Sequence, residues 1–110
     1  MGDSFMTFQD VFEKFKDEMK DKDISKIDGH LAFQFNITGE GEGKFYAEVN
    51  DGVLHIEPYE YYDRDAIFIC SAKTLFGIIS GKTDPIMAFT IGKLKVEGSI
   101  EKALKIKDII

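Results

Sequence analysis

Residues 84–104 read DPIMAFTIGKLKVEGSIEKAL, and this stretch decides the fold because it contains two helix starts, a helix stop and a strand. Asp84 is a natural N-cap, and Pro85 suits the first helical position because it has no N–H to leave unpaired there. Gly92 is expected to end the short helix. Alternating residues then predict a strand, and the Ser99 hydroxyl is expected to cap a last helix.

The N-terminal part of the chain predicts a long amphipathic helix. An apolar stripe recurs at helical spacing, and it consists of Phe5, Phe8, Phe12, Phe15 and Met19. Charged residues occupy the opposite side, as in a helix with one buried face. Ser4 or Thr7 could cap this helix, and the charge density at residues 22–23 predicts its end.

Alternating and apolar runs predict the sheet. The expected strands are residues 31–38, 45–49, 53–57, 66–70 and 93–97. The first four follow one another through turns and predict an antiparallel meander, with the first strand burying one face only. Ser71 is expected to start a short helix after the fourth strand. The pattern therefore predicts an α+β fold in which helices pack on one face of a five-stranded, mainly antiparallel sheet.

Length and charge narrow the class of protein. A chain of 110 residues predicts one domain, spanning 1–110. Its net charge of −6 argues against a nucleic-acid partner. Residues 92–110 nevertheless carry a net charge of +2, which fits either transient contact with an anionic membrane surface or a solvated helix face. No apolar run reaches the ~20 residues of a bilayer span.

We expect a cytoplasmic location. Cys70 is the only cysteine, so the chain forms no internal disulfide, which suits a reducing compartment. No secretion signal is recognisable at the N-terminus. The final residues, Lys107 to Ile110, are not the Ser-Lys-Leu peroxisomal address.

Candidate chemical groups are sparse, and we expect neither a cofactor nor a metal. The glycine-rich segment 39–43 joins two strands instead of opening a helix, which argues against a phosphate loop. His55 and Glu57 share a strand face, yet two ligands do not make a zinc site. Asp63 and Asp65 could hold a divalent cation, although a solvated loop is the favoured interpretation.

Nucleophilic catalysis has little support in the sequence. There is no Gly-x-Ser-x-Gly motif, and a pairing of Cys70 with His30 or His55 depends on geometry that the sequence does not show. We therefore expect no enzyme.

Several motifs resemble the sterol carrier protein 2 family. They are GHLAFQF at residues 29–35, SGKTDP at 80–85, and AF at 88–89 followed by GKLKVEG at 92–98. The resemblance extends over residues 12–106. It implies a sheet with helices over one face enclosing a hydrophobic tunnel, and binding of an apolar lipid such as a fatty acid, acyl-CoA or sterol without covalent chemistry.

The resemblance also implies which side chains line the tunnel. The residues expected to bind the ligand are Phe12, Phe15, Phe33, Phe35, Leu75, Phe76, Ile79, Phe89, Ile91 and Leu94. Ile91 stands where many family members carry Gln, so a polar anchor is lost and a fatty acid is favoured over a sterol. The N-terminal or the C-terminal helix is expected to act as the gate.

Two alternatives remain open, because periodicity does not separate a hollow interior from a packed one. The same fold with a filled core would be a structural or protein-interaction module. An enzyme would need a polar group inside the chamber, for which Cys70, Tyr46 and His55 are the candidates.

Overall fold

The computed structural model describes residues 6–110 and contains ten helices and strands in this part of the chain. Their order is α1 (Phe8–Met19), β1 (His30–Thr38), β2 (Gly43–Asn50), β3 (Val53–Glu57), β4 (Ala66–Ser71), α2 (Ala72–Ile79), α3 (Pro85–Thr90), β5 (Leu94–Gly98), α4 (Ile100–Ala103) and the 3-10 helix η1 (Leu104–Asp108). Every expected strand is present, within two residues of the predicted bounds. The α+β class predicted from the sequence is confirmed.

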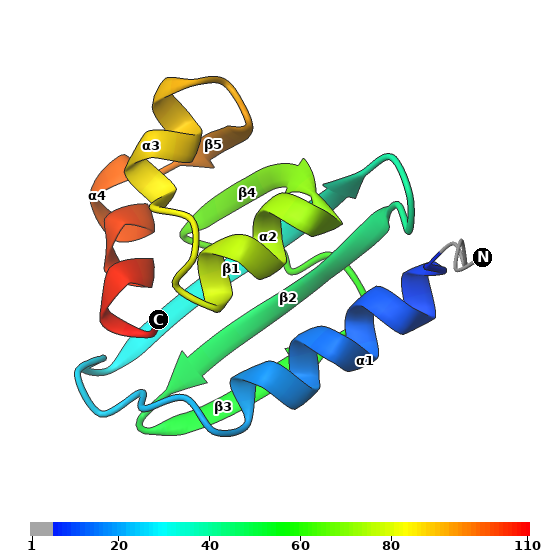
Figure 1. Cartoon of the computed structure of the whole chain (residues 1–110). Helices are drawn as coiled ribbons and strands as arrows, with labels where there is room; N and C mark the ends of the chain where they lie inside the picture. The colour runs from blue at the N-terminus through cyan, green and yellow to red at the C-terminus, as the bar shows by residue number, and fades with distance from the viewer. Residues whose placement is uncertain (1–5) are drawn as a thin grey trace.

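The helices cover one face of a five-stranded sheet (Figure 1). The strand order is β3-β2-β1-β4-β5. β1 pairs with β2, β2 with β3, and β4 with β5, each antiparallel. The expectation that β4 continues the antiparallel meander was wrong, because β4 lies beside β1 and runs parallel to it. The chain leaves β3 at one edge and must cross β2 and β1 before it enters the sheet again.

The crossing segment, residues 58–65, covers the sheet face that the helices leave open. The Asp65 carboxylate accepts a hydrogen bond from the Ala32 N–H at 2.8 Å, and the Asp65 N–H donates to the Ala32 carbonyl at 2.8 Å. The Tyr61 N–H donates to the Gln34 side chain at 3.0 Å. Gln34 is therefore only 1% exposed. β1 is buried on both faces, not on one as its alternating pattern predicts.

α1 begins as predicted and ends earlier. Thr7 caps it, and the Thr7 and Asp10 side chains form a reciprocal capping box. Ser4 and Phe5, the other expected cap and the first residue of the stripe, lie outside the described residues. The helix ends at Met19, and the Lys22 ammonium beyond it donates to the Ile79 carbonyl of α2 at 2.7 Å.

The helix caps in the C-terminal half are the residues predicted from the sequence. Ser71 caps α2, Asp84 caps α3 with Pro85 behind it, and Ser99 caps α4. The last helix is short, because the chain tightens after Ala103 into η1. A 3-10 segment of this length holds less well than an α-helix.

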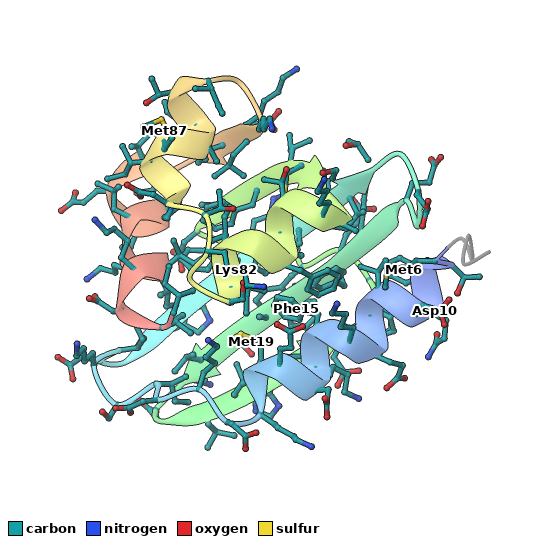
Figure 2. The ribbon with its side chains drawn as sticks, viewed as in Figure 1. Met6, Asp10, Phe15, Met19, Lys82 and Met87 are labelled. Atoms are coloured by element: carbon teal, nitrogen blue, oxygen red, sulfur yellow. The ribbon has the colours of Figure 1, made fainter. Side chains whose placement is uncertain are left out.

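The core lies between the sheet and the helices and is centred on aromatic rings. Phe15 of α1 packs on Phe35 and Phe45 of the sheet, with ring centroids 5.0 and 4.7 Å away. Phe35 also stacks on Phe68 at 5.5 Å. Phe15 and Met19 lie on the side of α1 that faces the sheet (Figure 2). These rings fill the middle of the interior and leave space at its margins.

Candidate functional site

An apolar groove of about 230 Å³ lies between α3 and α4, with the sheet as its floor. Its lining includes Phe68 of β4, Phe89 of α3, Leu94 and Val96 of β5, and Leu104 and Ile106 of η1. Only one charged residue, Lys107, contributes to the lining. We call this space the apolar groove.

The spacing of apolar residues on two short helices builds the groove walls. Pro85, Ile86 and Phe89 bring one face of α3 to it. Ile100, Ala103, Leu104 and Lys107 bring residues spaced three or four apart from α4 and η1. About half of the Ile86, Phe89, Ile100 and Leu104 surface is exposed, so the groove opens to solvent along an apolar rim. An apolar rim of this kind commonly marks a binding surface.

A second, much smaller space lies deeper in the interior. This inner void measures about 20 Å³, and its lining includes Phe15, Phe33, Phe35, Val49, Ile79 and Ile109. Ile106 lines both the inner void and the apolar groove. The Phe33 ring on the void side also meets the Phe68 ring on the groove side edge-on, with centroids 4.9 Å apart.

The apolar space of residues 6–110 thus includes two hollows that share Ile106 in their lining. Ile106 and the Phe33–Phe68 pair stand between the two hollows. Ile106 belongs to η1, which continues directly from α4 at Ala103.

A third hollow, of about 920 Å³, lies between α2 and α3 on the opposite side of α3 from the groove. We call it the lysine basin, because Lys14, Lys73, Lys82, Lys93 and Lys95 line it together with a single carboxylate, that of Glu18. Met87, Ala88 and Ile91 form its α3 side. α3 thus separates an apolar space from a cationic one.

The ten residues expected to bind the ligand are distributed over these three spaces and the core. Phe89 and Leu94 line the apolar groove. Phe15, Phe33, Phe35 and Ile79 line the inner void. Phe76 and Ile91 line the lysine basin. Phe12 and Leu75 are buried in the core and line none of the three.

Sequence reasoning missed most of the C-terminal wall of the groove. The missed residues are Ile100, Ala103, Leu104, Ile106 and Lys107, together with Phe68 on the floor and Pro85, Ile86 and Val96 beside it. The three- and four-residue spacing from Ile100 to Lys107 was the available signal. It indicates a helix with an apolar face, and such a face does not reveal whether it covers a core or a cavity.

The thiol and imidazole groups do not form a catalytic pair. Cys70 is buried, and burial raises its pKa to about 12, which keeps the thiol protonated at neutral pH. Cys70 pairs in register with Ile37, seven residues along β1 from His30, which corresponds to about 23 Å. His55 lies on β3 opposite Glu48, and two strands, β2 and β1, separate it from β4. Neither histidine reaches the thiol.

Polar residues on the outer sheet face form a separate network. Glu48 accepts hydrogen bonds from the Tyr61 hydroxyl and from His30, the latter at 2.6 Å. The Tyr61 hydrogen bond is the main cause that lowers the pKa of Glu48, while partial burial opposes it. The same bond raises the pKa of Tyr61 to about 12. Tyr46 stacks on Tyr61 at 4.3 Å. This network holds the 58–65 segment and lies away from the groove.

Metal-binding clusters and membrane-spanning helices are the two remaining features to consider in residues 6–110. No cluster of three or more metal-ligating side chains occurs among them. None of the helices described there has the length and apolar character needed to cross a membrane.

Comparison with known families and proteins gives a consistent match. A family model described as the SCP-2 sterol transfer family matches residues 8–110. Hydroxysteroid dehydrogenase-like protein 2 of Rattus norvegicus is 27% identical over 107 residues, which are 96% of this chain and 20% of that protein. The chain therefore spans about a fifth of the length of the curated relatives it matches.

Solved structures share the fold at low sequence identity. The stereoselective inverting sec-alkylsulfatase Pisa1 from Pseudomonas sp. superposes with a TM-score of 0.78 at 17% identity, covering 90% of this chain and 16% of that one. The solution structure of palmitated SCP2L2 from Aedes aegypti superposes with a TM-score of 0.64 at 18% identity, covering 94% and 93% of the two chains. Identities this low show the fold alone.

Proposed function

This chain belongs to the SCP-2 sterol transfer family, and we propose that residues 1–110 act as one domain that binds an apolar lipid in the groove between α3 and α4. The observation that carries the proposal is the groove itself, which is apolar apart from Lys107 and open along its rim. The domain carries its ligand without covalent chemistry and does not act as an enzyme.

A fatty acid suits the divided interior better than a sterol. The groove, at about 230 Å³, is smaller than the ~300–1,000 Å³ of usual ligand pockets, so a bound lipid must extend into newly opened space. A flexible chain can bend past Ile106 toward the inner void, whereas a rigid ring system cannot. The palmitated mosquito protein of the same fold supports this choice of ligand.

Apolar burial supplies enough free energy for binding. At roughly 0.8 kcal/mol per methylene, burying a 16-carbon chain gives on the order of 12 kcal/mol before losses. Lost ligand and side-chain freedom reduces this to affinities of about micromolar. Lys107 at the groove edge is placed to meet the carboxylate of a bound fatty acid.

The C-terminal segment is the better gate of the two that the sequence suggested. α1 is fixed by its capping box, its ring contacts with the sheet and the Lys22 bond to α2. η1 is a short 3-10 segment that continues from α4, and it carries Ile106. Opening therefore requires a shift of η1, with α1 left in place.

The rim of the groove also supports transient contact with a membrane surface. Exposed apolar side chains on α3 and α4 lie beside Lys102, Lys105 and Lys107. Such residues insert at the interface while lysines meet anionic headgroups. Contact through this rim would bring the groove opening to the lipid source.

The experiment compares two substitutions on opposite sides of α3. Phe89 lines the groove and is 50% exposed, while Met87 lines the basin and is 55% exposed. Because both side chains are half exposed, replacement by Gln keeps the fold. We expect Phe89→Gln to weaken binding of a fluorescent fatty acid about tenfold or more, and Met87→Gln to leave it unchanged.

The alternative is an interaction module with a filled core, which the aromatic rings in the middle of the interior would also allow. Fatty-acid binding and native mass spectrometry together test this alternative. Native mass spectrometry of the purified protein should show co-purified lipid. If the unaltered protein binds no fatty acid and holds no lipid, the carrier proposal is rejected. Equal binding by both variants would reject the groove as the site.

A further inference from the structure

The lysine basin concentrates positive charge in a chain that is acidic as a whole. Five lysines and one glutamate line it, leaving four positive charges in excess, whereas the chain carries −6. Glu18 already lies 3.9 Å from Lys14 in an ion pair within α1. Among residues 6–110, no carboxylate pairs with Lys73, Lys82, Lys93 or Lys95. Unpaired like charges gathered around one hollow repel each other unless an anion joins them.

These lysines come from four separate parts of the fold. Lys14 belongs to α1, Lys73 to the first turn of α2, and Lys82 to the loop before α3. Lys93 immediately precedes β5, and Lys95 lies in it. Figure 2 labels Lys82 in that loop and Met87 on the neighbouring α3. Folding, and not proximity in sequence, therefore assembles the charge.

The basin also offers neutral hydrogen-bond donors. The hydroxyls of Thr38 and Thr83 line it, while the Ser80 hydroxyl already donates to the Gly77 carbonyl at 3.1 Å. α2 opens onto it at Ser71 and Lys73, and its first turn contains no acidic residue to offset the positive end of the helix dipole. Lysine ammonium groups, hydroxyls and a helix N-terminus together favour a phosphate oxygen over a neutral ligand.

The size of the hollow favours a compact anion. Its volume of about 920 Å³ falls in the ~300–1,000 Å³ range of small-molecule sites. A long polyanion would extend beyond the basin and meet the acidic remainder of the surface. We therefore propose that the lysine basin binds a phosphate-bearing group, either a soluble phosphate compound or the headgroup of a lipid.

This site does not depend on the apolar groove, since α3 separates the two. Met87 and Ile91 face the basin, while Ile86 and Phe89 face the groove. A probe without an acyl chain can therefore test the basin alone. Inorganic pyrophosphate serves this purpose, and the Phe89→Gln variant should bind it as the unaltered protein does.

The test is an NMR titration of the full chain with inorganic pyrophosphate at low ionic strength. We expect amide resonances at Lys73, Thr83 and Lys93 to shift on binding. The double variant Lys73→Gln/Lys93→Gln should bind about tenfold more weakly. Added salt should weaken binding further, because the Debye length falls from about 10 Å at 0.1 M to 3 Å at 1 M.

The matched control removes the same charge elsewhere. Lys16 and Lys26 are exposed and line none of the three spaces, so Lys16→Gln/Lys26→Gln should bind pyrophosphate as the unaltered protein does. All four lysines are exposed, and circular dichroism should show unchanged folding in both double variants.

A second arm separates the two sources of phosphate. Phosphatidylcholine vesicles with and without phosphatidic acid are offered to the same variants. Pyrophosphate binding that depends on Lys73 and Lys93 supports a site sufficient for soluble phosphate compounds. Binding only to phosphatidic acid vesicles, lost in Lys73→Gln/Lys93→Gln alone, supports a lipid headgroup. The proposal is overturned if neither probe binds, or if both double variants weaken binding equally.

Discussion

Ile106 controls how much apolar space a ligand can use. It is buried and lines both the apolar groove and the inner void, and we propose that its side chain closes a passage between them. An incoming chain longer than the groove must displace this side chain, and the displacement reduces the net affinity.

Replacing Ile106 by Ala should therefore change stability and affinity in opposite directions. The free energy of unfolding should fall by about 2–5 kcal/mol, measured by urea denaturation without ligand. Fatty-acid affinity should rise, because the passage is already open. Ile78→Ala is the matched control, since Ile78 is buried in the core, lines none of the three spaces and should lose stability without gaining affinity. A loss of affinity in Ile106→Ala would contradict the gating role.

Lys107 is the residue that we expect to recognise the carboxylate. Lys107→Gln should weaken binding of a fatty acid about two- to fivefold, as expected for an exposed ion pair worth ~0.5–1 kcal/mol. Binding of the methyl ester, which carries no charge, should be the same in both proteins. Lys105→Gln serves as the control for a general loss of charge. An equal effect on acid and ester would show that Lys107 contributes packing only.

At the scale of elements, the sequence predicted the parts with strong local signals. The caps Ser71, Asp84 and Ser99 and the alternation of β1 and β2 depend on neighbours in the chain, so they were predictable. The partner of β4 was not, because pairing with β1 depends on the path of the 58–65 segment across the sheet. The C-terminal half of the groove was missed for a related reason, since whether a helix covers space or side chains depends on its partners.

The 58–65 segment is held by a contact whose strength depends on pH. The Tyr61 hydroxyl donates to Glu48 and lowers the pKa of that carboxyl below its ordinary value of 4.5. Because the folded state binds this proton less readily than the unfolded chain, the contact stabilises the fold above pH 4.5. Its contribution is lost as the pH falls below 4.5 through the lowered pKa.

Tyr61→Phe should therefore make the free energy of unfolding depend less on pH in the acidic range. The free energy of unfolding, measured in urea from neutral pH to below pH 4.5, should fall less steeply in the variant than in the unaltered protein. Tyr59→Phe is the control, because the Tyr59 hydroxyl instead lies 3.4 Å from Glu57 at the surface. Identical slopes for all three proteins would show that Glu48 and Tyr61 do not couple.

At the scale of the whole molecule, α3 divides the helical face into an apolar side and a cationic side. The apolar groove lies between α3 and α4, and the lysine basin lies between α3 and α2. This division is not visible in the composition of the chain, because the lysines and the apolar residues of these surfaces are scattered along the sequence. The family resemblance predicted an apolar interior, and its partition into a groove and an inner void follows from the positions of Phe33, Phe68 and Ile106.

The most direct test is an NMR measurement of intermolecular nuclear Overhauser effects between the protein and bound palmitate. The account predicts contacts from the acyl chain to Phe89, Leu94 and Leu104, with a changed environment for Ile106 and little change at Phe12 of α1. An acyl chain that instead contacts α1 and leaves α3, α4 and Ile106 unaltered would contradict the account, as would the absence of any bound palmitate.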